Sequence, residues 1–183
     1  MRIRFGILAV LMLIAPGATR AQTVHLGPQL GIFNATNADA SRLMAGLALR
    51  LRFSRAFGLE GSADYRQEDY SDGYITVRSW PVMVTALLYP LPVIYGAIGV
   101  GWYNSSIDYR AGYPGVVYYT SSETRQDFGW HLGGGVDLPL SRATHLVGDV
   151  RYVFLDYGFR EPSGATPLNN NFYVVMVGLQ FRL

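Results

Sequence analysis

The stretch Asn171–Leu183, with the sequence NFYVVMVGLQFRL, decides the fold class. Alternate side chains of a β-strand point to opposite faces. Counting back from Leu183, every second residue as far as Tyr173 is apolar, whereas the opposite face begins with Arg182 and Gln180. A strand whose apolar face is never interrupted is typical of a barrel that stands in lipid. A soluble sandwich can also end on such a strand, so the rest of the chain has to distinguish between these two folds.

Residues 1–21 have the layout of a secretory signal peptide. The basic start Met1–Arg4 precedes the apolar run Phe5–Ala15, and small residues before Gln22 offer a cleavage site. An apolar run of about eleven residues is too short for the ~20 that a helix needs to span a bilayer. An uncleaved anchor or a buried helix is the alternative. We therefore predict a signal peptide over residues 1–21 and one domain over residues 22–183.

The charge balance and the cysteine content exclude several classes of protein. All 15 basic residues are arginines, and Arg2, Arg4 and Arg20 leave with the signal peptide, so 15 − 3 = 12 arginines face 13 acidic residues. A nearly neutral chain has no basic excess to attract phosphates, which excludes a nucleic-acid partner. The chain has no cysteine. A secreted domain without disulfides has to be stabilised by a closed sheet or a large core.

Seven further segments show the two-residue period of a half-buried strand, which a helix with a period of 3.6 residues cannot produce. The clearest is 42–53, where the odd-numbered residues from Leu43 to Phe53 are apolar and the even-numbered ones include Arg50 and Arg52. The predicted strands cover about residues 24–34, 42–53, 57–66, 74–88, 93–105, 126–138, 144–155 and the terminal segment.

The segment 74–88 is ambiguous in phase. Arg78 suggests that even-numbered residues face inward at its start, whereas the apolar even-numbered residues after Pro81 suggest that they face outward. Proline cannot donate a hydrogen bond to a ladder and is often found at bulges. We therefore predict a bulge at Pro81 that switches the phase of the strand.

Eight strands of this length match the ~9–11 residues of a tilted membrane strand. The connections after the second, fourth and sixth strands are short, and those after the first, third, fifth and seventh are longer and polar. Short turns on one side and long loops on the other are expected of bacterial outer-membrane barrels. We predict an all-β fold, an eight-stranded antiparallel up-and-down transmembrane β-barrel, with both ends of the domain on the periplasmic side.

The interior of an eight-stranded barrel is just filled by side chains. Charges on the inner faces should therefore pair with one another, because an unpaired buried charge is costly. If Ser54–Ala56 forms a three-residue turn, Arg50 lies opposite Glu60, and we predict that these two side chains are in contact. Such a packed polar lumen argues against a wide channel. The predicted lumen charge network contains Arg50, Arg52, Glu60, Asp64, Arg66, Asp137, Asp149 and Arg151, together with Gln29, His131 and Gln180.

Glycines recur on the inward faces, for example Gly133 and Gly135. One interpretation is that they leave room for long arginine side chains opposite. The other is that they mark bends of a strongly curved sheet. The sequence favours neither.

Tyrosine and tryptophan gather at the two membrane–water boundaries of membrane barrels. In the outer loops, aromatic residues either contact solvent and lipid headgroups or bind a surface ligand. The girdle candidates are Tyr65, Trp102, Trp130, Tyr152, Phe154 and Tyr173, and the candidates in or near the outer loops are Tyr70, Tyr74, Tyr109, Tyr113, Tyr118 and Tyr119.

The order and spacing of four stretches of the chain carry a resemblance to a known family. These stretches are Trp80–Tyr89, Tyr95–Gly101, Gly129–Leu140 and Asp149–Tyr152. They resemble strands four to seven of the outer-membrane protein β-barrel family, the small OmpA-like and OmpX-like barrels. The terminal strand resembles the signal that the barrel assembly machinery reads, with Leu183 in place of the usual terminal aromatic residue. This family shares no common chemistry, so the resemblance implies a location and an architecture rather than an activity.

Some outer-membrane barrels are lipases or modify lipid A, so an enzyme is an alternative function. Acyl hydrolysis needs a serine nucleophile, a histidine base and an acid that orients the histidine. The histidines are His25, His131 and His145. His131 is expected to face inward, and Gly133 stands where the His-x-Ser pattern of the lipid A deacylase family would have its serine. We therefore predict no catalytic residue.

The acidic residues Glu68, Asp69 and Asp72 could bind a divalent cation, although a solvated acidic loop is the favoured interpretation. The glycines lie within strands rather than before a helix, so they do not form a phosphate-binding loop. We predict neither a metal nor a cofactor.

Together these observations predict a non-enzymatic integral protein of the cell outer membrane, either an envelope structural protein or a surface-interaction protein with long extracellular loops. The alternatives are a lipid-modifying outer-membrane enzyme, a small pore, and a soluble periplasmic sandwich or lipocalin-like barrel with its apolar faces inward. The expected partners are outer-membrane lipid and lipopolysaccharide, the barrel assembly machinery through the C-terminal strand, and a surface ligand on the loops. We expect a monomer.

Overall fold

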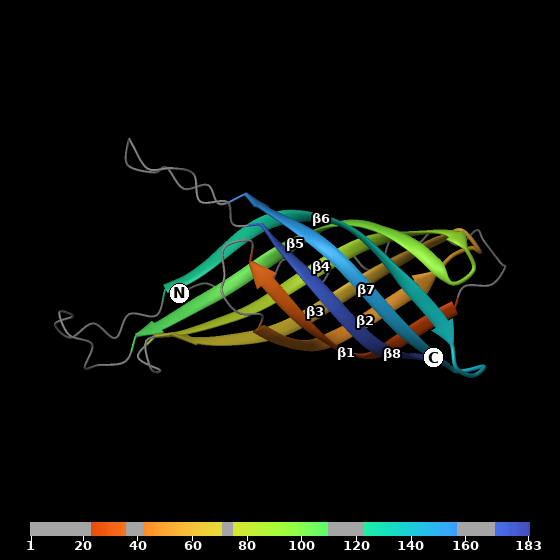
Figure 1. The fold of residues 1–183 in the computed structure, drawn as a ribbon, viewed down its shortest axis with the longest axis horizontal. Coiled ribbons are helices and arrows are strands. Elements are labelled where there is room, and N and C mark those ends of the chain that lie inside the picture. The colour runs from red at the N-terminus through yellow and green to blue at the C-terminus, as the bar shows by residue number, and fades with distance from the viewer. Residues whose placement is uncertain (1–22, 36–41, 71–74, 110–122, 157–170) are drawn as a thin grey trace.

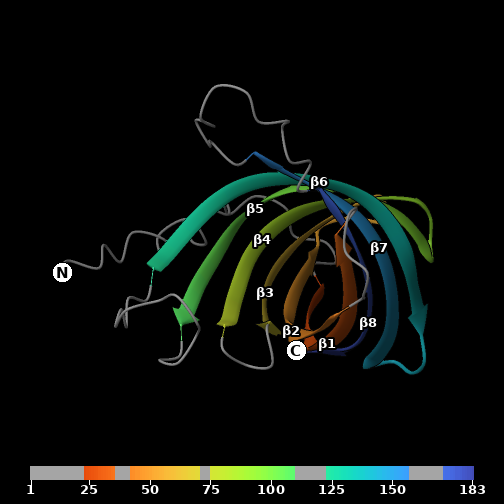
Figure 2. The ribbon, with the colours of Figure 1, turned by 60° about the vertical axis from the view of Figure 1, so that its left-hand side comes forward.

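The structure, a computed structural model, describes residues 23–35, 42–70, 75–109, 123–156 and 171–183. Within these ranges the chain forms eight antiparallel strands whose order in the sheet follows their order in the sequence (Figure 1). β1 pairs with β2 on one side and with β8 on the other, so the sheet closes into a barrel (Figure 2). This confirms the predicted fold class. The strands are β1 (Thr23–Ala35), β2 (Arg42–Arg52), β3 (Phe57–Tyr70), β4 (Ile75–Leu91), β5 (Ile94–Tyr109), β6 (Glu123–Pro139), β7 (Thr144–Asp156) and β8 (Phe172–Arg182).

Several strands extend further than the side-chain alternation predicted. β3 continues to Tyr70 and β5 to Tyr109, and backbone pairing with β4 holds both extensions in register. Backbone hydrogen bonds do not depend on which side chains are apolar, so the ladder continues where the two-residue pattern fades. In the part of the chain that is described, no helix is long and apolar enough to cross a membrane.

Two of the short turns at one end of the barrel have the same construction. The turns Phe53–Phe57 and Leu140–Thr144 both contain the tripeptide Ser-Arg-Ala. In each, the serine hydroxyl accepts hydrogen bonds from the backbone N–H groups of the second and third residues that follow, at 3.0 to 3.1 Å. Serine is well suited to this role because its short side chain can satisfy turn donors locally. Both turns leave their arginines, Arg55 and Arg142, exposed.

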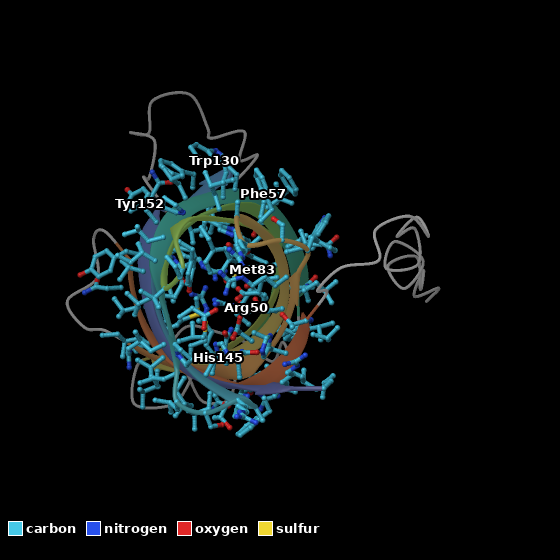
Figure 3. The ribbon with its side chains drawn as sticks, turned by 90° about the vertical axis from the view of Figure 1, so that its right-hand side faces the viewer. Arg50, Phe57, Met83, Trp130, His145 and Tyr152 are labelled. Atoms are coloured by element: carbon cyan, nitrogen blue, oxygen red, sulfur yellow. The ribbon has the colours of Figure 1, made fainter. Side chains whose placement is uncertain are left out.

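Side chains alternate between the lumen and the outer surface of the barrel. On β2, Leu43 and Leu47 are 78% and 56% exposed, whereas Ala48 and Arg50 are 1% and 4% exposed. Figure 3, a view along the barrel from the end with the short turns, shows Arg50 inside the ring of strands and Trp130 outside it. A soluble sandwich or lipocalin-like barrel would have the opposite arrangement. The apolar outer surface is that of a barrel surrounded by lipid.

The phase switch that the sequence predicted at Pro81 is wrong. The β4–β5 register continues without a shift through Pro81 and is irregular only between Leu88 and Leu91. Odd-numbered residues face the lumen on both sides of the proline, so Ser79 is buried and Arg78 is exposed. The prediction assumed that an arginine on a strand has to face inward. Near the outer end of a membrane strand, an arginine can instead extend along the outer surface toward water.

The lumen is packed in layers along the barrel axis. Along β7, Val153 lies in one apolar layer, Arg151 and Asp149 lie in a charged layer, and Val147 lies in a second apolar layer. The sequence predicted the charges but not the two apolar layers. We call them the outer apolar cluster (Phe33, Met44, Met83, Tyr103, Val153, Phe172, Val174 and Met176) and the inner apolar cluster (Leu87, Tyr89, Tyr95, Ala97 and Val147).

Candidate functional site in the barrel lumen

The predicted pairing of Arg50 with Glu60 is confirmed. The β2–β3 register places the two residues directly opposite each other. Arg50 Nε donates a hydrogen bond to Glu60 Oε2 at 2.5 Å. The contact follows from the three-residue turn that joins these strands, since the turn length fixes which residues face each other.

Glu60 also connects to the opposite wall of the barrel. Its Oε1 accepts a hydrogen bond from Arg151 Nη2 at 2.6 Å, and Arg151 Nε donates to Asp149 Oδ1 at 2.6 Å. Asp149 Oδ2 accepts a hydrogen bond from the Tyr95 hydroxyl at 2.7 Å, and that hydroxyl accepts one from Arg50 Nη2 at 2.7 Å. These five side chains therefore form a closed circuit, which we call the lumen ring.

The lumen ring joins strands that are not neighbours in the sheet. Glu60 on β3 reaches Arg151 on β7, and Arg50 on β2 reaches Tyr95 on β5. Backbone ladders join each strand only to its two neighbours, so these contacts brace the barrel across its interior. Two arginines and two carboxylates balance in charge. All members are buried, with Glu60 and Arg151 each 1% exposed.

A buried ion network of this kind holds one geometry in place but adds little net stability. Removing charges from water costs several kcal/mol per ion, and the gain from pairing offsets that cost only when the hydrogen bonds are well made. Removing one member is nevertheless costly, because its partner is then left as an unpaired buried charge. The network therefore selects one strand arrangement against others.

Asp137 lies between the lumen ring and the mouth of the barrel. Its Oδ1 lies 2.6 Å from His145 Nδ1, and its Oδ2 accepts a hydrogen bond from the Tyr89 hydroxyl at 3.3 Å. Arg50 Nη1 approaches Asp137 Oδ2 at 3.8 Å. The His145 ring also lies 4.7 Å from the His25 ring. Asp137 thus extends the polar network toward the end with the short turns.

Of the eight predicted network residues, four belong to the lumen ring, Asp137 adjoins it, and the other three lie apart from it. Asp64 Oδ1 accepts a hydrogen bond from Gln29 Nε2 at 2.7 Å. The Arg66 guanidinium lies 4.1 Å from the centre of the Phe33 ring, over the outer apolar cluster. Arg52 lies near the short turns, with its guanidinium 3.9 Å from the centre of the Tyr89 ring. Asp64 and Arg66 face the lumen at other depths along the barrel axis, and Arg52 lies at the mouth of the lumen beside the short turns.

The ring includes a residue that sequence reasoning missed. Tyr95 is 2% exposed and bridges Arg50 and Asp149. Tyrosines were considered only for the membrane boundaries and the loops. Its position on the inward phase of β5, in line with Ala97 and Gly99, is the signal that could have identified it.

Two inward glycines leave the space that this network needs. A Cβ on Gly133 would lie 2.1 Å from the carbonyl oxygen of Val150 and 3.0 Å from Cγ of Arg151. A Cβ on Gly135 would lie 2.6 Å from the Tyr95 hydroxyl. The nearest atom is nevertheless a carbonyl oxygen of β7 at both positions, Val150 O for Gly133 and Gly148 O for Gly135 at 2.2 Å, so close approach of the neighbouring strand excludes a Cβ there as much as the long side chains do.

The histidines lack the surroundings of an acyl hydrolase. His131 Nε2 lies 2.9 Å from the Thr85 hydroxyl, and both residues are 0% exposed. A substrate cannot reach such a pair. Among the residues that the structure describes, His25 and His145 have no serine within hydrogen-bond distance.

No metal-binding group is found in the described ranges, which contain no cluster of three or more His, Cys, Asp or Glu side chains able to hold an ion. Glu68 and Asp69 were predicted in a loop, but both belong to β3 and pair with β4 through their backbones. The structure does not describe their side chains, and Asp72 lies outside the described residues.

All six girdle candidates lie on the outer surface. Trp130 stacks on Phe154 with ring centroids 3.9 Å apart, and Tyr152 packs edge-on against the same Phe154 ring at 4.7 Å. Figure 3 shows Trp130 and Tyr152 projecting from the outside of the barrel. The remaining three are Tyr65, Trp102 and Tyr173. The side chains of the six tyrosines assigned to the loop region lie outside the described residues.

A closed eight-stranded barrel with an apolar exterior, outward aromatic residues and a charged, packed lumen defines an integral outer-membrane protein. The family model of the outer membrane protein beta-barrel domain matches residues 5–181. The chain therefore belongs to this family, as the resemblance implied, and is a protein of the cell outer membrane. No curated protein matches it.

Solved structures with the same fold are small outer-membrane barrels. Neisserial surface protein A is 13% identical, with a TM-score of 0.59, and the match covers 88% of this chain and 97% of that one. OprG from Pseudomonas aeruginosa is 14% identical, with a TM-score of 0.58 and coverage of 90% and 97%. Ail of Yersinia pestis, in complex with the heparin analogue sucrose octasulfate, is 16% identical, with a TM-score of 0.52 and coverage of 88% and 97%. At these identities the likeness is one of fold.

Proposed function

We propose that this protein is a non-enzymatic envelope protein, in which a rigid, plugged barrel anchors surface loops in the outer membrane. The observation that carries the proposal is the lumen ring, packed between the outer and inner apolar clusters. Side chains from opposite walls meet at hydrogen-bond distance and are almost fully buried, an arrangement that obstructs a continuous water path at that depth. A pore would need such a path, so the filled lumen favours an anchor over a small pore.

The same packing supports the absence of catalysis. The best-placed polar pair of the lumen, His131 and Thr85, is inaccessible, and the four charged members of the lumen ring are bonded to one another or to Tyr95. We infer that the network has a structural role and that neither a cofactor nor a metal is required.

We infer that the surface role belongs to the connections at the end opposite the short turns, residues 36–41, 71–74, 110–122 and 157–170. Their sequences contain two arginines, three acidic residues and several tyrosines. The Ail structure was solved with a polyanionic heparin analogue. These nearly balanced connections are less suited to a polyanion, and their tyrosines favour a protein or glycan surface that offers apolar contact.

The remaining parts of the proposal concern biogenesis. We propose that residues 1–21 are removed as a signal peptide, that the C-terminal strand is read by the barrel assembly machinery, and that the mature barrel is a monomer in contact with lipid and lipopolysaccharide. The intact mass of the protein isolated from membranes tests the first point, because cleavage before Gln22 gives a defined mass.

The function is tested by conductance in planar bilayers. We expect the folded protein, verified by its heat-modifiable gel mobility, to give no steady channels. The positive control is a variant in which Arg151 and Glu60 are both replaced by alanine. It lacks the ring contacts between opposite walls and should conduct. Steady unit conductance from the unmodified protein would contradict the anchor proposal and establish the pore.

A further inference from the structure

The end of the barrel with the short turns carries four arginines that form no ion pair with any described residue. Every acidic residue that the structure describes lies in the lumen or toward the opposite end. Within the described ranges, no carboxylate lies within ion-pair distance of the guanidinium groups at this end. We call these arginines the basic collar, which consists of Arg52, Arg55, Arg142 and Arg182.

Two members of the basic collar, Arg55 and Arg142, border the lipid-facing surface, whereas Arg52 and Arg182 lie at the mouth of the barrel on the lumen-facing phase of β2 and β8. Phe57 is 59% exposed and lies two residues after Arg55. Leu140 is 59% exposed and lies two residues before Arg142. An arginine at such an edge can lay its aliphatic stem along apolar surface and extend its guanidinium to the level of the lipid headgroups. The collar therefore lies at the boundary between the hydrocarbon core and the phosphate groups of the lipid headgroups.

One part of the collar is a shaped groove of about 570 Å³ between the turn after β2 and the end of β4. Arg52, Arg55 and Leu91 line it, so cationic and apolar groups share its walls. Arg52 is held in place, because its Nη2 donates to the carbonyl oxygens of Arg55 and Pro92 at 3.3 and 3.2 Å, and its guanidinium rests on the Tyr89 ring. A guanidinium that is already ordered loses little entropy when it binds an anion.

We propose that the basic collar binds the phosphate groups of anionic phospholipids in the periplasmic leaflet of the outer membrane. Guanidinium groups match phosphate oxygens in two-point hydrogen bonds, and the neighbouring apolar residues accommodate the acyl chains. The mature chain is nearly neutral in total, so the collar arises from the distribution of charge and not from an excess. This role belongs to the end of the barrel with the short turns and does not depend on the loops at the opposite end.

The test uses the folded mature barrel in nanodiscs made of equal amounts of phosphatidylglycerol and phosphatidylcholine. Native mass spectrometry of the released protein gives the ratio of the two lipids that stay bound. We expect enrichment of phosphatidylglycerol in the unmodified protein. Replacing all four collar arginines by glutamine should abolish the enrichment, with a loss of about fivefold for each arginine that touches a bound lipid. Replacing them by lysine, which keeps the charge but cannot form the two-point hydrogen bonds, should retain only part of it.

The matched control is Arg66→Gln, which neutralises an arginine whose guanidinium lies inside the barrel over the Phe33 ring, and it should leave the lipid ratio unchanged. Heat-modifiable mobility verifies folding. If the fourfold glutamine variant does not fold, Arg55→Gln with Arg142→Gln, which alters only exposed turns, should still reduce the enrichment severalfold.

Three results would overturn the proposal. The first is equal retention of both lipids by the unmodified protein. The second is complete displacement of phosphatidylglycerol by millimolar inorganic phosphate, which would mean a site for free phosphate and not for a lipid. The third is collar-dependent binding of soluble acidic peptidoglycan fragments without any lipid enrichment, which would identify the cell wall as the occupant.

Discussion

Replacing Glu60 by glutamine should destabilise the barrel far more than an equivalent change elsewhere in the lumen. Glu60 is 1% exposed and accepts hydrogen bonds from Arg50 Nε at 2.5 Å and Arg151 Nη2 at 2.6 Å. Glutamine keeps the shape but removes the charge, and its amide N–H₂ group would face arginine donors. Asp149 would then be the one carboxylate left in the ring for two buried guanidinium groups.

The magnitude follows from the two contacts that are lost. A hydrogen bond to a charged group contributes about 1.5–3 kcal/mol, so two such bonds amount to roughly 3–6 kcal/mol. Breaking a buried ion pair by removing one partner costs about 3–5 kcal/mol. Both routes indicate a loss of about 4 kcal/mol in the free energy of unfolding.

The assay is urea-induced unfolding of the barrel in lipid vesicles, followed by gel mobility and tryptophan fluorescence. The control is Asp64→Asn, which removes a carboxylate from the same strand and the same lumen. Asp64 accepts a hydrogen bond from the neutral Gln29, so its replacement should cost about 1 kcal/mol. If the Glu60 variant lies within about 1 kcal/mol of the unmodified protein, or equals the Asp64 variant, the cross-lumen ring does not brace the barrel.

Three further predictions can be checked with the same unfolding assay. Gly133→Ala should cost about 1–3 kcal/mol, because its Cβ would lie 2.1 Å from a carbonyl oxygen, whereas Gly61→Ala, with nothing within 4 Å, should be nearly neutral; equal costs would refute the close-approach argument. Leu47→Arg should destabilise the barrel by about 2–4 kcal/mol if this outward residue lies near the bilayer midplane, and an unchanged stability would mean that Leu47 does not face lipid. Trp130→Ala should cost about 0.5–1.5 kcal/mol beyond its buried area by removing the stack on Phe154, and the double variant with Phe154→Ala should show that coupling; strictly additive losses would refute it.

The sequence could predict features that depend on neighbouring strands. The two-residue period identified all eight strands, and a three-residue turn was enough to place Arg50 opposite Glu60. Side-chain alternation also separated the lumen from the outer surface, except near Pro81, where one arginine misled the assignment. These features are local, because each depends on one strand or one short turn.

Features that depend on the whole barrel could not be predicted in the same way. Whether Glu60 meets Arg151 depends on the stagger accumulated over the strands between β3 and β7, and no local pattern reports that stagger. For the same reason the sequence grouped Arg52, Asp64 and Arg66 with the ring, although they lie at other depths. The inward phase of β5 could have placed Tyr95 in the lumen, but its bridge between Arg50 and Asp149 depends on the same stagger and could not be predicted.

The central claim is that the apolar side of each strand contacts lipid tails while the charged side is enclosed. It is tested most directly with phospholipids that carry a photoreactive diazirine in the acyl chain, irradiated with the unmodified folded protein and mapped by mass spectrometry. The account predicts adducts on Leu47, Leu49 and Val177 and none on Arg50 or Arg151. Adducts on the two arginines, with none on those three apolar residues, would contradict it.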